Sequence, residues 1–365
     1  MRIGILGGGQ LGRMLALAAH PLGHEVVTWS RYADEPAAAV SKMVLGEFED
    51  EAALASFVAL VDVVTYEFEN VPAAIVDAVA RHCPVRPGVK SLRIAADRVS
   101  EKNLFRALGI GTAPFAAVED LASLEQAVAK LGLPAVLKTR RLGYDGKGQR
   151  VLRAEGELED AWAALGGVPC ILEGFMPFSR ELSILGVRGA SGEVRTYPLV
   201  ENVHQGGILR VTQAPAPGVS KSMEHAANEA IRATLEELDH VGVLAMELFD
   251  VGGVLFANEI APRVHNTGHF SIEGATTSQF ENHIRAVVGA PLGDTSLRGA
   301  SWMRNLIGRI PPVEEMLTVP GAHLHLYGKS ERTARKVGHI TVSGSSPEAI
   351  QPSMESLSRL VNDDG

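Results

Sequence analysis

A lysine at the end of a short apolar run precedes a loop that is rich in glycine. Residues 134–137 are apolar, Lys138 follows them, and glycine stands at 143, 146 and 148. Glycine lets the backbone approach a ligand closely, and successive exposed N–H groups beside lysine form a cradle for phosphate oxygens. Asp-Gly and Lys-Gly pairs are also ordinary turn residues. The stretch 135–149 is therefore interpreted either as a phosphate-binding loop or as a hairpin with solvated cations.

Two glutamates lie in consecutive apolar strands, which are predicted at 243–250 and 254–261. A carboxylate among core residues is unfavourable unless it is paired or bound to a cation. Mg²⁺ takes one or two protein carboxylates together with phosphate oxygens, so Glu247 and Glu259 would suit it. A strict two-residue turn would instead pair Glu247 with Asn258 and turn Glu259 to the opposite face. Shared metal binding therefore predicts a bulge or an odd-length loop; the alternative is that each glutamate faces solvent.

Cationic and imidazole groups crowd the loop that follows, which reads PRVHNTGH at 262–269. Arginine, histidine and amide groups packed this closely in a Pro/Gly loop indicate recognition of an oxyanion. The pair His265 and His269 would also suit zinc, but no third ligand has the usual spacing. A second basic segment at 329–336 is either a solvated face or a pocket for a phosphate ester.

A glycine turn joins the first predicted strand, Arg2–Leu6, to a helix at 13–19. Gly7, Gly9 and Gly12 fit the dinucleotide fingerprint G-x-G-x-x-G. The second strand, however, is followed by Trp-Ser-Arg-Tyr and not by the acid that binds ribose. Such turns also bind other anions, or only allow close packing of strand and helix. An NAD site is therefore one interpretation among three.

A further strand is predicted at 61–66 and leads directly into Glu67. Ligands of open parallel sheets bind beyond the carboxyl ends of the strands. Gln10 and Glu67 are therefore expected on one rim of this sheet. The alternative for Glu67 is a solvated acid in a loop.

Helical spacing at 121–131 and 158–165 alternates with short strands at 134–138, 149–152 and 170–173. This order predicts a small α+β lid around the glycine loop. The pattern becomes mainly β after residue 181, with amphipathic helices near 224–238 and 281–288.

The composition excludes several classes of protein. The chain has 365 residues, enough for two or three domains, and a formal charge of −9, which argues against a general nucleic-acid binder. Its two cysteines, Cys83 and Cys170, leave no disulfide framework, so the cytoplasm is the expected compartment. No apolar run approaches the roughly 20 residues that span a bilayer, and no secretory signal is expected.

Five segments, in a fixed order, resemble the 5-(carboxyamino)imidazole ribonucleotide synthases of the ATP-grasp superfamily. They read GGGQLGRM at 7–14, YEFENV at 66–71, GYDGKGQ at 143–149, NEIAPRVHNTGH at 258–269 and RKVGH at 335–339. The resemblance covers nearly the whole chain. It implies an α/β and α+β architecture of three parts: a Rossmann-like parallel-sheet domain at 1–100, a central lid domain at 101–185 and a C-terminal mixed domain at 186–365.

The resemblance also implies a reaction of purine biosynthesis. ATP and bicarbonate would give carboxyphosphate, whose carbon is taken by the exocyclic amine of 5-aminoimidazole ribonucleotide, with ADP and phosphate released. ATP as co-substrate, Mg²⁺ and a homodimer are implied as well, without nucleic acid or membrane as partners.

The family's site residues carry over to matching positions of this chain. Those implied for the nucleotide are Arg98, Lys138, Gly143, Tyr144, Asp145, Gly146, Lys147, Gly148, Gln149, Glu173, Gly174, Phe175, Met176, Glu181, His204, Asn258 and Glu259. Glu247 and Glu259 are implied as metal ligands. The catalytic group around bicarbonate and carboxyphosphate would be Asp145, Lys147, Arg263, His265 and Asn266. The imidazole ribonucleotide would meet Gln10, Leu11, Glu67, Lys329 and Arg335.

Other functions explain fewer of these features. Another ATP-grasp ligase or transformylase of purine metabolism would share the residues for ATP. An NAD-binding oxidoreductase would rest on the turn at 7–12 alone. A non-catalytic nucleotide-binding module would not need the cluster at 263–266.

Overall fold

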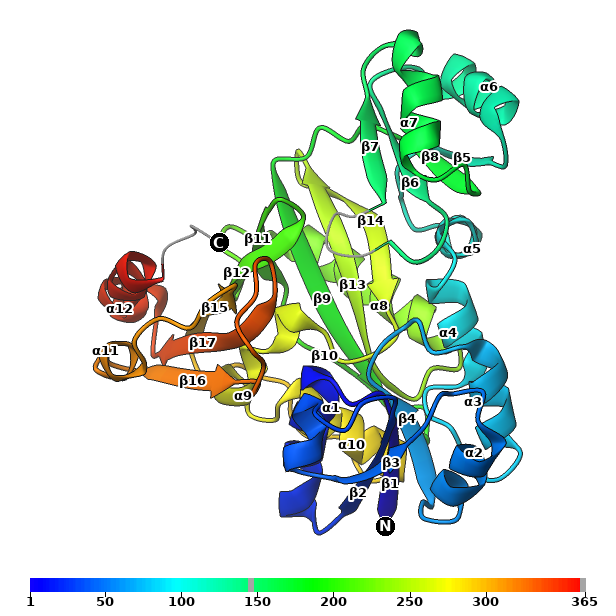
Figure 1. The fold of residues 1–365 in the computed structure, drawn as a ribbon. Helices are drawn as coiled ribbons and strands as arrows, with labels where there is room; N and C mark the ends of the chain where they lie inside the picture. Colours follow the sequence, from blue (N-terminus) through cyan, green and yellow to red (C-terminus); the bar gives the residue numbers. More distant parts are fainter. Residues whose placement is uncertain (144–147, 362–365) are drawn as a thin grey trace.

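The computed structural model describes residues 1–143 and 148–361, and within them the strands form three sheets. Figure 1 shows the blue N-terminal sheet below, the small cyan-to-green lid above, and the large sheet between them, continuing into the orange and red C-terminal region. Of the described helices, none combines the length and the apolar character needed to cross a bilayer.

The N-terminal sheet is fully parallel, with the order β3-β2-β1-β4. The predicted Rossmann-like arrangement is therefore confirmed. The strand at 42–45 was not predicted, and next to β4 Val85 forms an isolated bridge with Val64. The elements of this region are β1 (Arg2–Leu6), α1 (Gln10–Ala19), β2 (Glu25–Ser30), β3 (Lys42–Leu45), α2 (Glu51–Val58), β4 (Val63–Tyr66), α3 (Ala73–Ala80) and α4 (Val89–Ala95).

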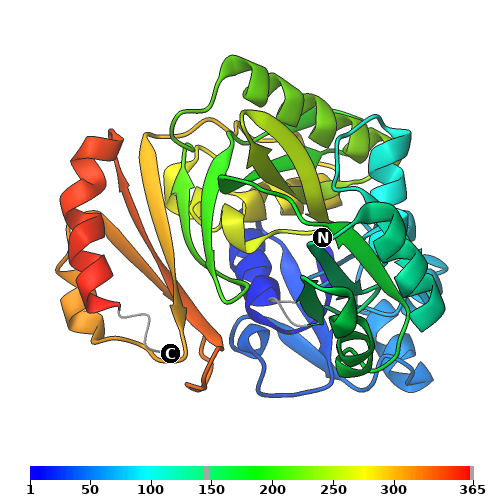
Figure 2. The same cartoon turned by 90° about the horizontal axis from the view of Figure 1, so that it is seen from above.

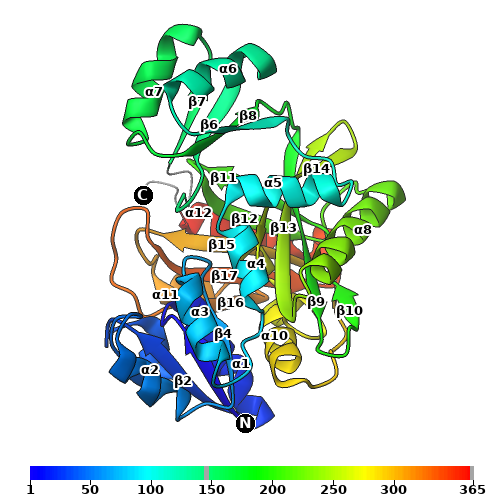
Figure 3. The same cartoon turned by 90° about the vertical axis from the view of Figure 1, so that its right-hand side faces the viewer.

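The lid is an antiparallel sheet, β5-β8-β6-β7, covered by two helices whose apolar side chains pack on it. The predicted small α+β unit around the glycine loop is confirmed, with β5 as an additional strand. Helix α5 (Arg98–Ala107) leads into the lid, and Figure 3 shows it beneath the lid. The lid elements are β5 (Phe115–Val118), α6 (Leu121–Leu131), β6 (Ala135–Thr139), β7 (Gln149–Leu152), α7 (Leu158–Ala164) and β8 (Cys170–Gly174).

The large sheet runs β14-β13-β9-β11-β12-β15-β17-β16, with β10 paired to β9. Helix α8 packs on the β9–β13 side, and α12 covers β15 and β17 at the other end, as Figure 2 shows. Its elements are β9 (Arg180–Arg188), β10 (Val194–Thr196), β11 (Val200–Gln205), β12 (Ile208–Ala214), α8 (Lys221–Glu237), β13 (Gly242–Val251), β14 (Val254–Ala261), α9 (Ser271–Gly274), α10 (Gln279–Val288), β15 (Ala300–Ile307), α11 (Val313–Leu317), β16 (Ala322–Leu326), β17 (Lys336–Gly344) and α12 (Pro347–Leu360).

Helix α10 joins the N-terminal sheet to the large sheet. Its apolar face, with Phe280 and Ile284, belongs to a core that also contains Ile3 of β1 and Leu185 of β9. Its buried His283 lies 2.8 Å from the Thr65 hydroxyl of β4 and accepts the backbone N–H of Val243 in β13 at 3.0 Å. This helix therefore fixes the rim of the first sheet against the large one.

The glycine turn at 7–12 closes around a carboxylate of its own chain. Glu67 accepts the backbone N–H of Gly9 at 2.5 Å and that of Gly12 at 2.8 Å. A Cβ at Gly7 would lie 2.5 Å from Glu67 Cγ, and one at Gly9 would lie 2.6 Å from Glu67 Oε1. The N–H groups that a fingerprint of this kind offers to a pyrophosphate are thus engaged by Glu67. The glycines are needed because this side chain approaches so closely.

Replacing Gly7 by alanine is expected to lower the free energy of unfolding by roughly 2–4 kcal/mol, because the new Cβ overlaps Glu67 and φ is positive. Gly23 is the matched control: its φ is also positive, but nothing lies within 4 Å of an added Cβ. Gly23→Ala should therefore lose only about 1 kcal/mol. Denaturant unfolding of both variants measures the difference, and equal losses would refute the close packing of Glu67.

Candidate active site

A cleft of about 990 Å³ opens where the three sheets meet. The lid, the rim of the N-terminal sheet and the large sheet all contribute to its walls. The predicted site residues that line it are Gln10, Leu11, Glu67, Arg98, Lys138, Gly143, Gln149, Glu173, Gly174, Phe175, Met176, Glu181, His204, Glu247, Asn258, Glu259, Arg263, His265, Asn266, Lys329 and Arg335. Residues from nearly the whole length of the chain, from Gln10 to Lys336, are thus brought to one cavity.

Among the described residues, one that was predicted for the site, Gly148, does not line the cleft. A Cβ added to it would lie 2.7 Å from the Thr139 hydroxyl oxygen. Tyr144, Asp145, Gly146 and Lys147 lie outside the described residues, so the roles predicted for them stay predictions.

The two strand glutamates face each other through a register shift. From Val251 paired with Val254, the ladder runs to Leu248 paired with Ala257, and then Glu247 pairs with Glu259. Asn258 is the extra residue between them. The bulge that a shared metal site requires is therefore present, and the prediction from turn geometry is confirmed. Asn258 adds a buried Oδ1 that has no hydrogen-bond partner within residues 1–143 and 148–361.

Opposite charges meet beneath the lid strand β6. Lys138 Nζ lies 3.0 Å and Lys102 Nζ 3.6 Å from Glu173 Oε2. Burial alone would raise the pKa of Glu173, but the two ammonium groups more than offset it and lower the pKa. Arg98 NH1 pairs with Glu259 Oε2 at 2.9 Å. The wall therefore presents cations toward the cleft while each has a carboxylate behind it.

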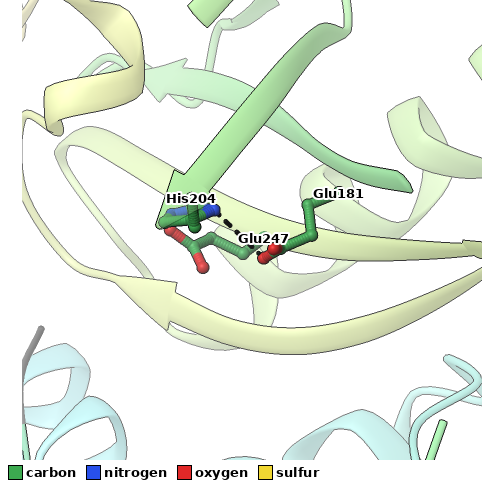
Figure 4. Close-up of side chains that lie close together, drawn as sticks. All are labelled: Glu181, His204 and Glu247. Carbon is green, nitrogen blue, oxygen red and sulfur yellow. Dashed lines mark ion pairs between the residues drawn. The ribbon is translucent and has the colours of Figure 1, made fainter. Parts of the chain in front are cut away.

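Three neighbouring strands bring Glu181, His204 and Glu247 together, and Figure 4 shows their side chains converging. His204 Nδ1 lies 3.2 Å from Glu181 Oε2. Burial lowers the pKa of His204, but its contact with Glu181 and the charge of Glu247 outweigh this and raise it. Burial and the charge of Glu259 raise the pKa of Glu247 to about 7. The group could hold a cation in the absence of nucleotide, but two of its three residues are those expected at the nucleotide.

The loop after β14 forms the far end of the cleft. Arg263 Nε donates to Glu69 Oε2 at 2.5 Å, and Gln279 fixes His265 by accepting its backbone N–H at 2.9 Å and donating to its carbonyl at 2.6 Å. Burial, then the charge of Arg263, lowers the pKa of His265 to about 3, so the imidazole is neutral. Both amide atoms of Asn266 are buried without a partner in the described chain. This end offers one cation, Arg263, and two neutral polar side chains, His265 and Asn266, to an oxyanion.

The basic segment at 329–336 reaches across to the N-terminal domain. Lys329 donates a hydrogen bond to Gln10, and Arg335 NH1 donates to the Ser330 hydroxyl at 2.8 Å. Burial lowers the pKa of Lys329 to about 8, and the charges of Arg335 and Lys336 act in the same direction. The two ends of the chain thus share one corner of the cleft.

Several residues that line the cleft were not predicted from the sequence. Glu69 stands in YEFENV and Lys336 in RKVGH, so motif membership was a usable signal for both. Phe178 and Phe249 stack with ring centroids 4.4 Å apart on the cleft wall. Phe178 lies in the segment before β9 and Phe249 in β13, so their stacking is a tertiary contact that spacing does not reveal.

Family models match almost the entire length of the chain. Residues 1–96 match the ribonucleotide synthetase preATP-grasp domain, 103–280 the ATP-grasp domain, and 301–353 the phosphoribosylaminoimidazole carboxylase C-terminal domain.

Relatives of known name are similar over their full length. The chain is 49% identical to the N5-carboxyaminoimidazole ribonucleotide synthase of Pseudomonas aeruginosa, over 99% of each chain. It is 47% identical to that of Brucella melitensis, over 93% of this chain and 95% of the relative. The Thermus thermophilus synthetase structure superposes with a TM-score of 0.95 at 52% identity, covering 99% of each chain. An Aspergillus clavatus synthase in complex with ADP and 5-aminoimidazole ribonucleotide has a TM-score of 0.89 at 31% identity, covering 98% of each chain.

Replacing Glu173 by glutamine is expected to lower the free energy of unfolding by roughly 3 kcal/mol, because it leaves buried lysines without their counter-charge. The control is Glu119→Gln, since the Glu119 side chain is 58% exposed in its pair with Arg140 and should contribute less than about 1 kcal/mol. Chemical denaturation of both variants is the measurement. A loss at Glu173 no larger than at Glu119 would show that the lysines do not need this carboxylate.

Proposed function

The chain belongs to the ATP-grasp family of N5-carboxyaminoimidazole ribonucleotide synthases, and we propose how its residues divide that family's reaction among them. The reaction is the ATP-dependent carboxylation of 5-aminoimidazole ribonucleotide by bicarbonate. A bicarbonate oxygen bonds to the γ-phosphorus of ATP as the bond to ADP breaks. The amine nitrogen then bonds to the carboxyl carbon, phosphate leaves, and the nitrogen loses a proton. The observation that carries this assignment is the convergence of cationic, acidic and oxyanion-binding groups in one cleft.

At the nucleotide end, Lys138 and Arg98 bind the phosphates and Glu173–Met176 bind adenine through backbone groups. Phe178 and Phe249 add an apolar wall for the base. Glu181 and His204 take the ribose, which explains why a carboxylate and a cation-forming imidazole lie 3.2 Å apart on this wall. The loop from Gly143 to Gln149 closes over the phosphates and keeps water from carboxyphosphate.

Magnesium fits the residues that the bulge brings together. Glu247 and Glu259 offer carboxylate oxygens from facing strands, and the unpartnered Asn258 Oδ1 is a third oxygen donor. Oxygen-only donor sets with room for phosphate oxygens are what Mg²⁺ prefers. When bound, the ion neutralises charge on the transferring phosphoryl group.

At the carboxyphosphate end, Arg263 neutralises the oxyanion, and the Glu69 carboxylate holds the guanidinium in place. His265 acts as a neutral hydrogen-bonding group because its pKa is held at about 3. The unpartnered amide of Asn266 supplies a donor. Asp145 and Lys147 of the closing loop complete this end.

At the ribonucleotide end, Lys329 and Arg335 bind the 5′-phosphate, while Gln10 and Leu11 meet the imidazole ring. Glu67 acts mainly by holding the turn in place, since both its oxygens already accept backbone N–H groups. We further propose a cytoplasmic homodimer whose domains span residues 1–100, 101–185 and 186–365.

An assay of ADP release with Mg-ATP tests the function. Bicarbonate and 5-aminoimidazole ribonucleotide are added singly and together, and the full rate is expected only with both, because the amine consumes the carboxyphosphate. ¹⁴C from labelled bicarbonate should enter an acid-labile product in step with ADP. ADP formation that ignores both additions would reject the assignment.

The affinity for 5-aminoimidazole ribonucleotide is expected to fall by about tenfold from about pH 7 to about pH 9. Lys329 has a pKa lowered to about 8, so it carries its charge below this pH and loses it above. The phosphate ester stays doubly charged across this range, since its second pKa is about 6.

The measurement is the KM for the ribonucleotide across this pH range, with the KM for ATP as an internal control. Lys329→Arg keeps a permanent charge and should flatten the profile. A profile that is equally steep in this variant would remove Lys329 from the phosphate site.

A further inference from the structure

The bulge at Asn258 leaves backbone groups without partners on β13. If the two-residue connection at 252–253 continued in regular register, Glu247 would lie opposite Asn258, and Glu259 would point to the other face. The shift disrupts the ladder locally and leaves the extra residue unpaired. Buried backbone groups nevertheless need hydrogen-bond partners, so something outside the ladder has to supply them.

Helix α5 supplies them on the carbonyl side. Lys102 Nζ donates to the carbonyl oxygen of Asn258 at 2.8 Å and to that of Ala257 at 3.3 Å. The hydroxyl of Thr112, in the segment between α5 and β5, donates to the same Ala257 carbonyl at 2.8 Å. Both carbonyl groups before Glu259 are thus held by side chains from a different part of the chain.

The same helix also holds the backbone on the other side of Glu259. Glu101 Oε1 accepts the N–H of Ile260 at 2.6 Å. Glu101 and Lys102 follow Arg98 by three and four residues, so the three side chains lie on one face of the helix. Arg98 pairs with the Glu259 carboxylate itself. Helix α5 packs against β14, and Figure 3 shows the two side by side.

Both side chains are almost fully buried, at 2% exposure for Glu101 and 1% for Lys102. Consecutive charged residues are rarely buried unless they are paired and hydrogen-bonded. Within residues 1–143 and 148–361, Lys102 makes one ion pair, with Glu173 Oε2 at 3.6 Å, and its shorter contacts go to the bulge. Hydrogen bonding to the backbone of residues 257–260 therefore explains the buried charges of Glu101 and Lys102 better than a general contribution of these side chains to the core does.

We propose that Glu101 and Lys102 are positioning residues that set Glu259 opposite Glu247 and so determine the geometry of the divalent-cation site. This inference rests on the proposed function, which assigns the cation to these two glutamates. Neither residue is placed on the cation or on a substrate; each acts through the backbone of residues 257–260. Thr112 assists on the carbonyl side.

Mn²⁺ binding to the ADP complex, followed by electron paramagnetic resonance, tests this without measuring turnover. Lys102→Met replaces the ammonium group and its hydrogen-bond donors with an apolar side chain of similar length. It should weaken Mn²⁺ binding at least tenfold. Thr112→Val removes one donor and should weaken it about threefold. Thr295→Val is the matched control, because Thr295 also donates to a backbone carbonyl at 2.8 Å, that of Thr196, away from the cleft. Its Mn²⁺ affinity should be unchanged.

Glu101→Gln and Glu101→Leu separate positioning from charge. Glutamine keeps an oxygen that accepts the Ile260 N–H and should retain most of the Mn²⁺ affinity, while leucine should lose it. Hydrogen exchange should rise locally at 255–262 in Glu101→Leu and Lys102→Met. Mn²⁺ affinities within twofold of the wild type in folded Lys102→Met would overturn the proposal. If that variant does not fold, Thr112→Val decides in the same way against its control.

Glu259→Gln distinguishes this inference from the proposed function. It should abolish Mn²⁺ binding in the ADP complex. If it binds Mn²⁺ as the wild type does, the assignment of the cation to Glu259 fails whatever the positioning residues do. If it loses Mn²⁺ while Lys102→Met and Thr112→Val retain it, only the positioning role fails.

Discussion

Charges buried at the junction of α5, the lid and the edge strand β14 constrain the rest of this structure. Lys102 and Lys138 converge on the buried Glu173, and Arg98 pairs with Glu259 at the edge of the cleft. An ion taken out of water is tolerated only when its partners are fixed. These side chains come from four elements: α5, β6, β8 and β14. The lid, the helix and the strand therefore have to be arranged together, and the cleft takes its shape from that arrangement.

Much of the fold follows from local patterns. The strands Arg2–Leu6, Gln149–Leu152 and Val254–Ala261 have the bounds that their apolar runs predict. The turn length alone would pair Glu247 with Asn258, because side chains alternate along a strand and a two-residue turn sets the register. The bulge that pairs Glu247 with Glu259 followed only from the further hypothesis that the two acids share a metal ion. The lid and its glycine loop were predicted for a similar reason, since helical and strand periods alternate over a short span.

Other features depend on contacts between residues distant in sequence. Glu69 and Arg263 are 194 residues apart, and nothing near either residue indicates the other. The strand at 42–45 exists because it pairs with β2, although its own sequence is short and partly exposed. The glycine turn illustrates the limit most clearly. Its spacing indicates an anion site, and the structure contains the anion, but the anion is a side chain of the same protein.

Because Glu67 occupies the turn at α1, the N–H groups of Gly9 and Gly12 are engaged by a side chain of the same chain. The cations that the proposed function assigns to the phosphate, Lys329 and Arg335, stand more than 300 residues later, and Lys329 donates to Gln10 across 319 residues of sequence. A domain that resembles a self-sufficient nucleotide binder has thus become half of a composite site. Cut out as a module or fused to another protein, it would lose both these cations and the packing of α10 against its sheet. Recombination within this family is expected to move the first and last segments together.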